Sequence, residues 1–156
     1  DGPMGKMNFL HHVGMSVPSL DEARRFYVGL LGFSELGAAE FARDEDIDRI
    51  LALEGASAKV AFLAFGDFKI EMFEFLAPEQ HRDDTGSPVH FHGITHLCLD
   101  VTDVREVHAR LKAAGMRFHS DPVDKAGVRT VYGRDPFGNV IELQEIVESD
   151  PISGGM

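Results

Sequence analysis

The sequence predicts an α+β fold in which one βαβββ module occurs twice. Three observations lead to this prediction: both halves open with the same type of segment, both close with the same type of segment, and the size suits one domain. A chain of 156 residues with 44% hydrophobic content can bury one core but is too short for two large independent domains. We therefore expect a single domain over residues 8–148, with a first module at 8–80 and a second at 92–148.

Each predicted module opens with a strand, a capped turn, an amphipathic helix and a glycine. Glycine is common directly after a helix because it adopts the left-handed conformation at little cost. The strand, helix and glycine lie at 10–17, 21–31 and Gly32 in the first half, and at 94–101, 105–114 and Gly115 in the second.

Each module also closes with a strand that contains the motif Ile-Glu-x-x-Glu. Residues 59–74 align with residues 130–145 without a gap, so Glu71 matches Glu142. The alignment leaves the first half longer than the second, and we place the extra residues at 40–58.

This extra segment is predicted to contain a short helix. Asp44 or Asp46 can cap it, because a short carboxylate side chain accepts hydrogen bonds from the first backbone N–H groups of a helix. Its apolar side chains share one face, which we expect to pack over the mouth of a binding cavity and exclude water. They are Ile47, Ile50 and Leu51. The matching connection in the second half, 121–127, is turn-like throughout.

The strand period places one histidine of each module on a face with small or polar side chains. Successive strand residues point to opposite sides of a sheet. His12 therefore shares a face with Gly14, and the matching His96 shares one with Cys98, while the apolar residues of both strands face the helices. His11 points the other way, so His12 is the preferred candidate.

By the same parity, Glu71 and Glu142 lie on the corresponding face of the closing strands. A lone strand histidine is more often a packing residue, and a lone strand glutamate is usually exposed to solvent. The same His/Glu pair at both matching positions favours a functional interpretation. Carboxylates gathered near imidazoles on a cavity face need a compensating positive charge, which a divalent metal ion supplies.

Other side chains are candidates for substrate contact or for ordinary packing. His90 and His92 precede the second module and are interpreted as linker histidines or as contacts to substrate or ligands. Arg129 could meet an anionic group, and Cys98 is interpreted as an inert buried thiol. The candidate substrate contacts are Phe73, Phe75, His92, Arg129 and Tyr132.

Composition excludes several classes of function. The net charge of −11 and the absence of a Lys/Arg-rich stripe argue against nucleic acid and anionic membranes as partners, and favour a small-molecule substrate. A single cysteine allows no intrachain disulfide, and no secretory or membrane-spanning segment stands out, so we expect a cytoplasmic protein. Residues 1–7 have the composition of an expression remnant, and 149–156 that of a flexible tail.

Three motifs resemble one known family over nearly the whole chain, from Leu10 to about Glu145. The segment His-Val-Gly-Met-Ser-Val at 12–17 resembles its opening strand, and Phe-Tyr at 26–27 with Leu-Leu-Gly-Phe at 30–33 resembles the end of its first helix. Asp-Pro-Phe-Gly-Asn-Val-Ile-Glu-Leu at 135–143 resembles its closing motif. The family is the vicinal oxygen chelate superfamily, which includes glyoxalase I, methylmalonyl-CoA epimerase, extradiol dioxygenases, and fosfomycin and bleomycin resistance proteins.

The resemblance implies an open, eight-stranded, barrel-like sheet, the glyoxalase fold. It makes His12, Glu71, His96 and Glu142 the ligands of one divalent ion, for which Ni, Co, Zn, Mn and Fe(II) all suit the donor set. The ion would stabilise an enediolate or enolate formed from a small carbonyl or thioester substrate, and Glu71 or Glu142 would act as the base. We expect a homodimer, with each site built within one chain or across the dimer.

Within this family the preferred reaction is that of an isomerase, epimerase or lyase. An extradiol dioxygenase is the second alternative, but such enzymes use two histidines and one carboxylate, and Glu71 would be a fourth ligand. A metal-free binding or resistance protein is the third. Proteins of that kind normally lose the ligand residues, and all four are present here.

Overall fold

The computed structural model describes residues 2, 4–80 and 86–148. It divides into two compact units, Asp1–Gln80 and His81–Met156, and each carries one mixed β-sheet. The predicted α+β fold with a repeated module is confirmed, whereas the grouping of 8–148 into one domain stays a prediction. The predicted flexible tail at 149–156 lies outside the described residues. Among the described helices, none is long and apolar enough to cross a membrane.

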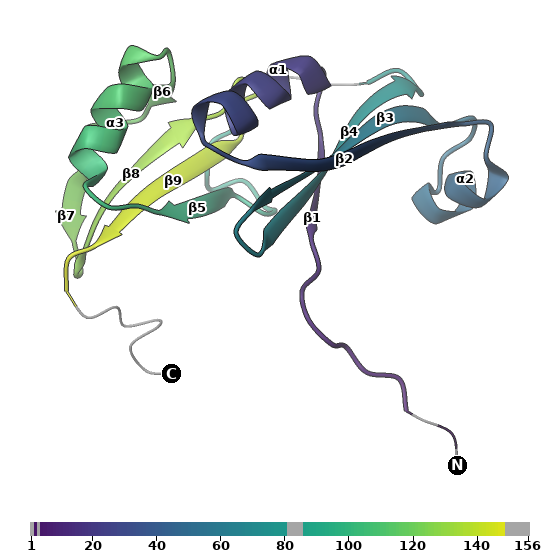
Figure 1. Cartoon of the computed structure of the whole chain (residues 1–156), viewed down its shortest axis with the longest axis horizontal. Helices are drawn as coiled ribbons and strands as arrows, with labels where there is room; N and C mark the ends of the chain where they lie inside the picture. The colour runs from purple at the N-terminus through teal and green to yellow at the C-terminus, as the bar shows by residue number, and fades with distance from the viewer. Residues whose placement is uncertain (1, 3, 81–85, 149–156) are drawn as a thin grey trace. The chain divides into compact units, whose positions relative to one another are not determined.

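The first unit forms a four-stranded sheet in the order β1-β4-β3-β2, in which β1 and β4 are parallel and the other pairs are antiparallel (Figure 1). The predicted helix is divided between an α-helix and a π-helical segment. The elements are β1 (Val13–Ser16), α1 (Leu20–Arg24), the π-helix η1 (Arg25–Leu30), β2 (Ser34–Ala42), α2 (Glu45–Leu51), β3 (Ser57–Phe65) and β4 (Phe68–Ala77).

The second unit repeats this arrangement in the order β5-β9-β8-β6, with β5 and β9 parallel and with β7 paired to β8. The position of one strand in the first unit is taken here by two short strands, so the described residues form nine strands and not the expected eight. The elements are β5 (His96–Asp100), α3 (Val104–Ala113), β6 (Arg117–Phe118), β7 (Val123–Lys125), β8 (Val128–Arg134) and β9 (Val140–Ile146).

The core of each unit lies between its sheet and its helix. In the first, α1 packs against β3 and β4, and in the second, α3 packs against β8 and β9. Ile70 and Met72 on β4 are fully buried, as are Ile141 and Leu143 on β9. The strand alternation therefore turns the glutamate between each buried pair to the opposite face of its sheet. The predicted parity is correct for both closing strands.

The repeat extends to individual contacts. Gly14 lies opposite Glu71, and Cys98 lies opposite Glu142 in the other unit. The second glutamate of each Ile-Glu-x-x-Glu motif also has the same structural role twice. The Oε1 atom of Glu74 accepts the backbone N–H of the first residue of α1 at 2.9 Å, and that of Glu145 accepts the N–H of the first residue of α3 at 3.0 Å. Each closing strand thus carries one candidate ligand and one helix cap.

The gapless alignment of 59–74 with 130–145 is wrong by one residue in the strand before the turn. It matches Phe62 with Gly133, but the residues that lie opposite Glu71 and Glu142 are Phe62 and Tyr132. The chain from Tyr132 to Glu142 is one residue longer than the chain from Phe62 to Glu71, and an alignment without a gap cannot show this. Tyr132 is therefore the structural counterpart of Phe62.

The insertion forms the predicted helix, and Asp44 is its cap. Its Oδ1 atom accepts the backbone N–H groups of Asp46 and Ile47 at 3.0 and 3.1 Å. Ile50 is 79% exposed, and no residue of α2 lines the pocket beside His12 and Glu71. The helix follows the Ala42 end of β2, whereas that pocket lies at the opposite end, so the predicted packing over the cavity is not found within this unit.

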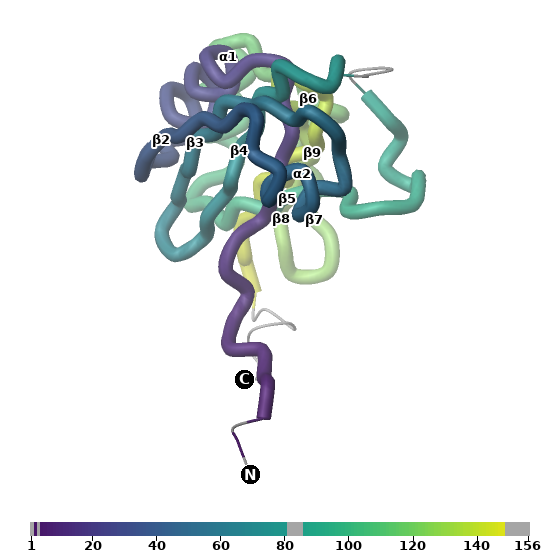
Figure 2. The backbone as a smooth tube through the Cα atoms, turned by 90° about the vertical axis from the view of Figure 1, so that its right-hand side faces the viewer, coloured from purple at the N-terminus to yellow at the C-terminus, as the bar shows by residue number. Residues whose placement is uncertain are grey.

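Residues 4–12 run out from the sheet as an extended segment (Figure 2). The predicted strand at 10–17 is shorter in the structure, where pairing starts at Val13. Phe9 and Leu10 are 75% and 88% exposed. His12 is thus the last residue before regular pairing begins.

Candidate metal centre

The first His/Glu pair joins the start of β1 to its parallel neighbour β4. The Nε2 atom of His12 lies 3.7 Å from Oε2 of Glu71, and the two side chains are 40% and 23% exposed. The Nδ1 atom of His12 lies 2.9 Å from Nδ1 of His11. His11 thus contacts Nδ1 of His12, while Nε2 of the same ring faces the carboxylate of Glu71.

The second pair joins the start of β5 to β9 in the same way. The Nε2 atom of His96 lies 3.2 Å from Oε1 of Glu142, and the side chains are 30% and 14% exposed. Thr95, the residue before the histidine, places its Oγ1 atom 2.9 Å from His96 Nδ1. The same three-part arrangement of neighbour, histidine and glutamate therefore occurs in both modules.

The second pair has two further polar contacts from β8. The hydroxyl of Thr130 donates to Oε2 of Glu142 at 2.5 Å, and the hydroxyl of Tyr132 lies 3.5 Å from His96 Nε2. The rings of Tyr132 and His96 have centroids 4.9 Å apart. These contacts orient both members of the pair, as partners outside the ligand set do in metal sites.

Negative charge around the second pair is concentrated on Glu142. Desolvation, followed by the charge of Glu142, raises the pKa of the Cys98 thiol to about 12. Desolvation and the same carboxylate also raise the pKa of Tyr132. Both groups therefore stay neutral near pH 7. We expected Cys98 to be buried, but it is exposed. Its protonated thiol is nevertheless a poor nucleophile, because the thiolate is the reactive form.

The donor atoms suit a divalent transition metal. Each pair directs one imidazole nitrogen and one carboxylate oxygen toward each other, which is a donor set that Zn, Ni, Co, Mn and Fe(II) accept. Each module supplies two donors. In the part of the chain that the structure describes, no three His, Cys, Asp or Glu side chains gather closely enough to hold an ion. A four-ligand site would need both pairs and stays a prediction.

A pocket of about 290 Å³ adjoins the first pair. Most of its surface is apolar, and Leu36 and Phe62 are 59% and 38% exposed. Its lining residues are His11, His12, Leu36, Gly37, Phe62, Lys69, Ile70 and Glu71.

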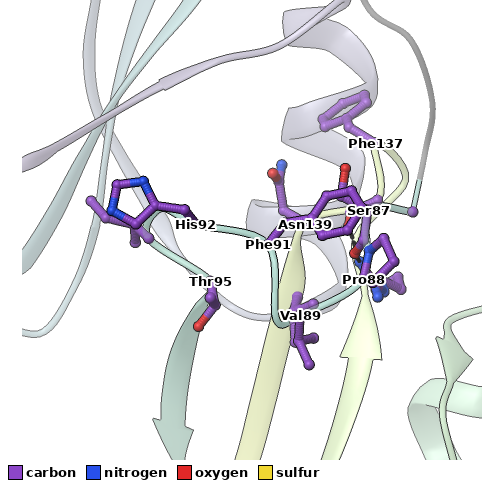
Figure 3. Close-up of a pocket in the computed structure, with 13 residues that line it drawn as sticks. Ser87, Pro88, Val89, Phe91, His92, Thr95, Phe137 and Asn139 are labelled. Atoms are coloured by element: carbon purple, nitrogen blue, oxygen red, sulfur yellow. Dashed lines mark hydrogen bonds between the residues drawn. The ribbon is translucent and has the colours of Figure 1, made fainter.

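A second pocket, of about 310 Å³, lies in the other unit between the segment before β5 and the turn before β9 (Figure 3). Arg134 holds the two sides together, because its Nη1 atom donates to the carbonyl oxygens of Ser87 and Gly138, both at 2.9 Å. His92 and Thr95 line this pocket, so Thr95 touches both the pocket and His96. His90 packs its ring against Phe91 at 5.0 Å and is not part of the lining.

The remaining candidate contacts differ in position. Phe73 and Phe75 stack on β4 with centroids 5.6 Å apart, half-buried and on the strand face of Glu71. Arg129 lies opposite Glu145, on the other strand face from Tyr132. Its Nε and Nη2 atoms donate to Asp124 at 2.6 and 3.2 Å, and Nη1 lies 3.7 Å from Glu145. The guanidinium group of Arg129 is therefore paired with Asp124 and Glu145, and we do not include it in the site.

Sequence reasoning did not identify the residues that hold the pairs, namely His11, Thr95 and Thr130. A signal was present for the first two, because a side chain with hydrogen-bonding atoms precedes each candidate histidine. Thr130 could not be found in this way, since its contact with Glu142 depends on strand register.

The comparisons with known proteins agree with this architecture. A family model described as Glyoxalase/Bleomycin resistance protein/Dioxygenase superfamily matches residues 9–143. A 2-epi-5-epi-valiolone epimerase from Actinomyces sp is 33% identical over 91% of this chain and 81% of its own length. An ethylmalonyl-CoA/methylmalonyl-CoA epimerase from Cereibacter sphaeroides is 28% identical over 88% of this chain and 97% of its own length.

Solved structures give the same result. The crystal structure of a glyoxalase family protein from Bacillus cereus has a TM-score of 0.83 at 26% identity, and the match covers 92% of this chain and 97% of that one. The chain therefore belongs to the Glyoxalase/Bleomycin resistance protein/Dioxygenase superfamily.

Proposed function

We propose that this chain is a divalent-metal-dependent epimerase in which the two His/Glu pairs bind one ion. The observation that carries the proposal is the repeated geometry, in which a neighbour contacts Nδ1 of each histidine while Nε2 faces a glutamate. Both curated relatives described above are named as epimerases. We further propose that the chain forms a homodimer, with each site built within one chain or shared between two.

The reaction would be the removal of a proton from one face of a carbon next to a carbonyl group and the return of a proton to the opposite face, which inverts that carbon. A divalent ion at this site would act as a Lewis acid toward the negative charge that develops on the substrate oxygen. A base within reach of the carbon must take the proton, and a positioned base contributes about 10²- to 10⁴-fold to the rate.

Glu71 is the better candidate for this base. Thr130 fixes Glu142 by a hydrogen bond, whereas Glu71 receives no hydrogen bond from the described residues and is more exposed. A carboxylate that moves a proton between two faces of a carbon must itself be able to move. We therefore assign Glu142 to metal binding alone, and Glu71 to metal binding and, when it leaves the ion, to proton transfer.

Solvent exchange tests this assignment directly. Metal-loaded protein is incubated in heavy water with methylmalonyl-CoA or with 2-epi-5-epi-valiolone, the substrates that the names of the relatives suggest, and deuterium incorporation is followed by mass spectrometry. Glu71→Gln should lower exchange about 10²- to 10⁴-fold. The matched control is Glu74→Gln on the same strand, which keeps a cap oxygen for α1 and should keep exchange.

The dioxygenase alternative makes the opposite prediction. There His12, His96 and Glu142 would form the ligand triad, and Glu71 would only be a neighbour. Oxygen-dependent cleavage of a catechol that survives Glu71→Gln would overturn the epimerase proposal.

A further inference from the structure

The apolar pocket of the first unit contains one cationic side chain, Lys69. It is half-buried on β4 and lies two residues before Glu71, so both side chains are on the same face of the strand. No carboxylate of the described residues lies within 4.0 Å of its ammonium group, since it takes part in none of the ion pairs of the structure.

Most Lys and Arg side chains of the described residues also take part in no ion pair, so the absence of one does not by itself distinguish Lys69. The Lys69 side chain is half-buried among apolar neighbours, where a charge interacts more strongly with an anionic partner than it does in bulk water. Lys59 on β3 is also outside every ion pair, but it is exposed and lines neither pocket. The distinctive feature of Lys69 is therefore its place beside the candidate metal ligands His12 and Glu71.

We propose that Lys69 binds the carboxylate of the substrate, and that the surrounding pocket takes a short aliphatic part of the same molecule. Leu36 and Phe62 present exposed apolar surface, which favours a hydrocarbon group over a polyhydroxylated one. The inference rests on the proposed function for the place of the reaction. It refines the substrate to an aliphatic carbonyl compound or thioester that bears a carboxylate.

A comparison of the two modules supports the proposal that Lys69 contacts only one end of the substrate, its carboxylate. Lys69 and Val140 occupy matching positions, one residue before the buried isoleucine of each closing strand. Val140 is buried and apolar, so the second module has no cation at this point. The two sides of the proposed site would therefore treat a substrate differently, and only the first would attract its carboxylate.

Two probes that differ in charge test the proposal without an ion. The Kd values of hexanoate and hexanamide are measured by NMR titration of metal-free protein, and the ratio of amide Kd to carboxylate Kd is compared between variants. Lys69→Met should lower this ratio about fivefold, as expected for a partly exposed ion pair. Lys69→Arg should keep most of the ratio of the parent protein, because the positive charge is retained. The repulsion from Glu71 is common to all of these proteins and cancels in the comparison.

The Kd of hexanamide serves as the folding control, because an intact pocket in Lys69→Met should bind the neutral probe as before. Lys59→Met removes the same charge outside the pocket and should leave the ratio unchanged. An unchanged ratio in Lys69→Met, or an equal fall in Lys59→Met, would overturn the inference. Because the protein is metal-free, failure of the metal proposal leaves this result interpretable, and failure of the Lys69 inference leaves metal binding untouched.

Discussion

Glu71 and Glu142 occupy matching positions in the two modules, but the protein holds them differently. Glu142 is 14% exposed, lies 3.2 Å from its histidine and receives a hydrogen bond from Thr130. Glu71 is 23% exposed and lies 3.7 Å from its histidine. Two copies of one module have thus produced one fixed carboxylate and one freer carboxylate.

The difference has its origin in two positions of the strand beside each glutamate. Thr130 lies opposite Gln144, and its counterpart Val60 lies opposite Phe73. Valine has no hydroxyl to donate. In the same way Tyr132, which contacts His96, is replaced by Phe62 in the first module. The backbone is duplicated, but among the described residues the polar support from the adjacent strand occurs in the second copy alone, which suits a division between a fixed ligand and a carboxylate that can transfer a proton.

The largest expected effect concerns the histidines. His96→Ala should lower metal affinity about 100-fold or more, since even partners outside the ligand set are worth about 10- to 100-fold. His12→Ala should also weaken binding, but by less, because its pair is farther apart and more exposed. Competition with a chelating dye measures both affinities. A larger loss in His12→Ala would contradict the view that the second pair is the stronger anchor.

The support of Glu142 can be removed without changing side-chain volume. Thr130→Val should lower metal affinity about tenfold by releasing the carboxylate. Val60→Thr, the reciprocal exchange in the first module, should not weaken binding, and it should slow proton exchange if the new hydroxyl restrains Glu71. Equal metal affinities in Thr130→Val and the parent protein would show that the hydrogen bond does not position the ligand.

The helix caps provide a feature that the two modules share equally. Glu74→Ala and Glu145→Ala each remove an acceptor from the first N–H of a helix, and each should lower the free energy of unfolding by about 1 kcal/mol. The 3.7 Å contact between Glu145 and the partly exposed Arg129 should add little to the second value. Urea denaturation of the metal-free proteins measures the change. Strongly unequal losses would mean that the caps are not equivalent.

The smallest expected effect belongs to the second module and is lost in acid. The hydrogen bond from Arg129 holds the pKa of Asp124 below its ordinary value of 3.8. A lowered pKa stabilises the folded state above the ordinary value, and this stability is lost as the pH falls through the folded-state pKa. The difference in urea midpoint between the parent protein and Asp124→Asn should therefore be constant near neutral pH and shrink below about pH 4. A difference that grows in acid would reverse the assignment.

Sequence reasoning found the module, the parity of its strands and the four candidate ligands, because those features depend on local period and on internal repetition. The structure confirms the repeat at the level of strand register and caps, with Glu74 and Glu145 in the same role. The placement of the four ligands around one ion stays a prediction.

Features that depend on contacts between strands could not be predicted from the sequence. The extra residue before β9 shifts β8 by one position, which brings Tyr132 and not Gly133 opposite Glu142. The roles of Thr130 and Tyr132 follow from that shift. The insertion helix combines both situations. Its cap at Asp44 is a local contact and could be predicted, whereas its position relative to the pocket depends on distant contacts and could not.

The most direct test of the central claim, that both pairs hold one ion, is the metal content of dialysed protein measured by mass spectrometry. We predict close to one divalent ion per chain in the parent protein, and far less than one in both His12→Ala and His96→Ala, at a free metal concentration about tenfold above the parent Kd. Two ions per chain, or full occupancy in either variant at that concentration, would contradict the claim that the pairs act together.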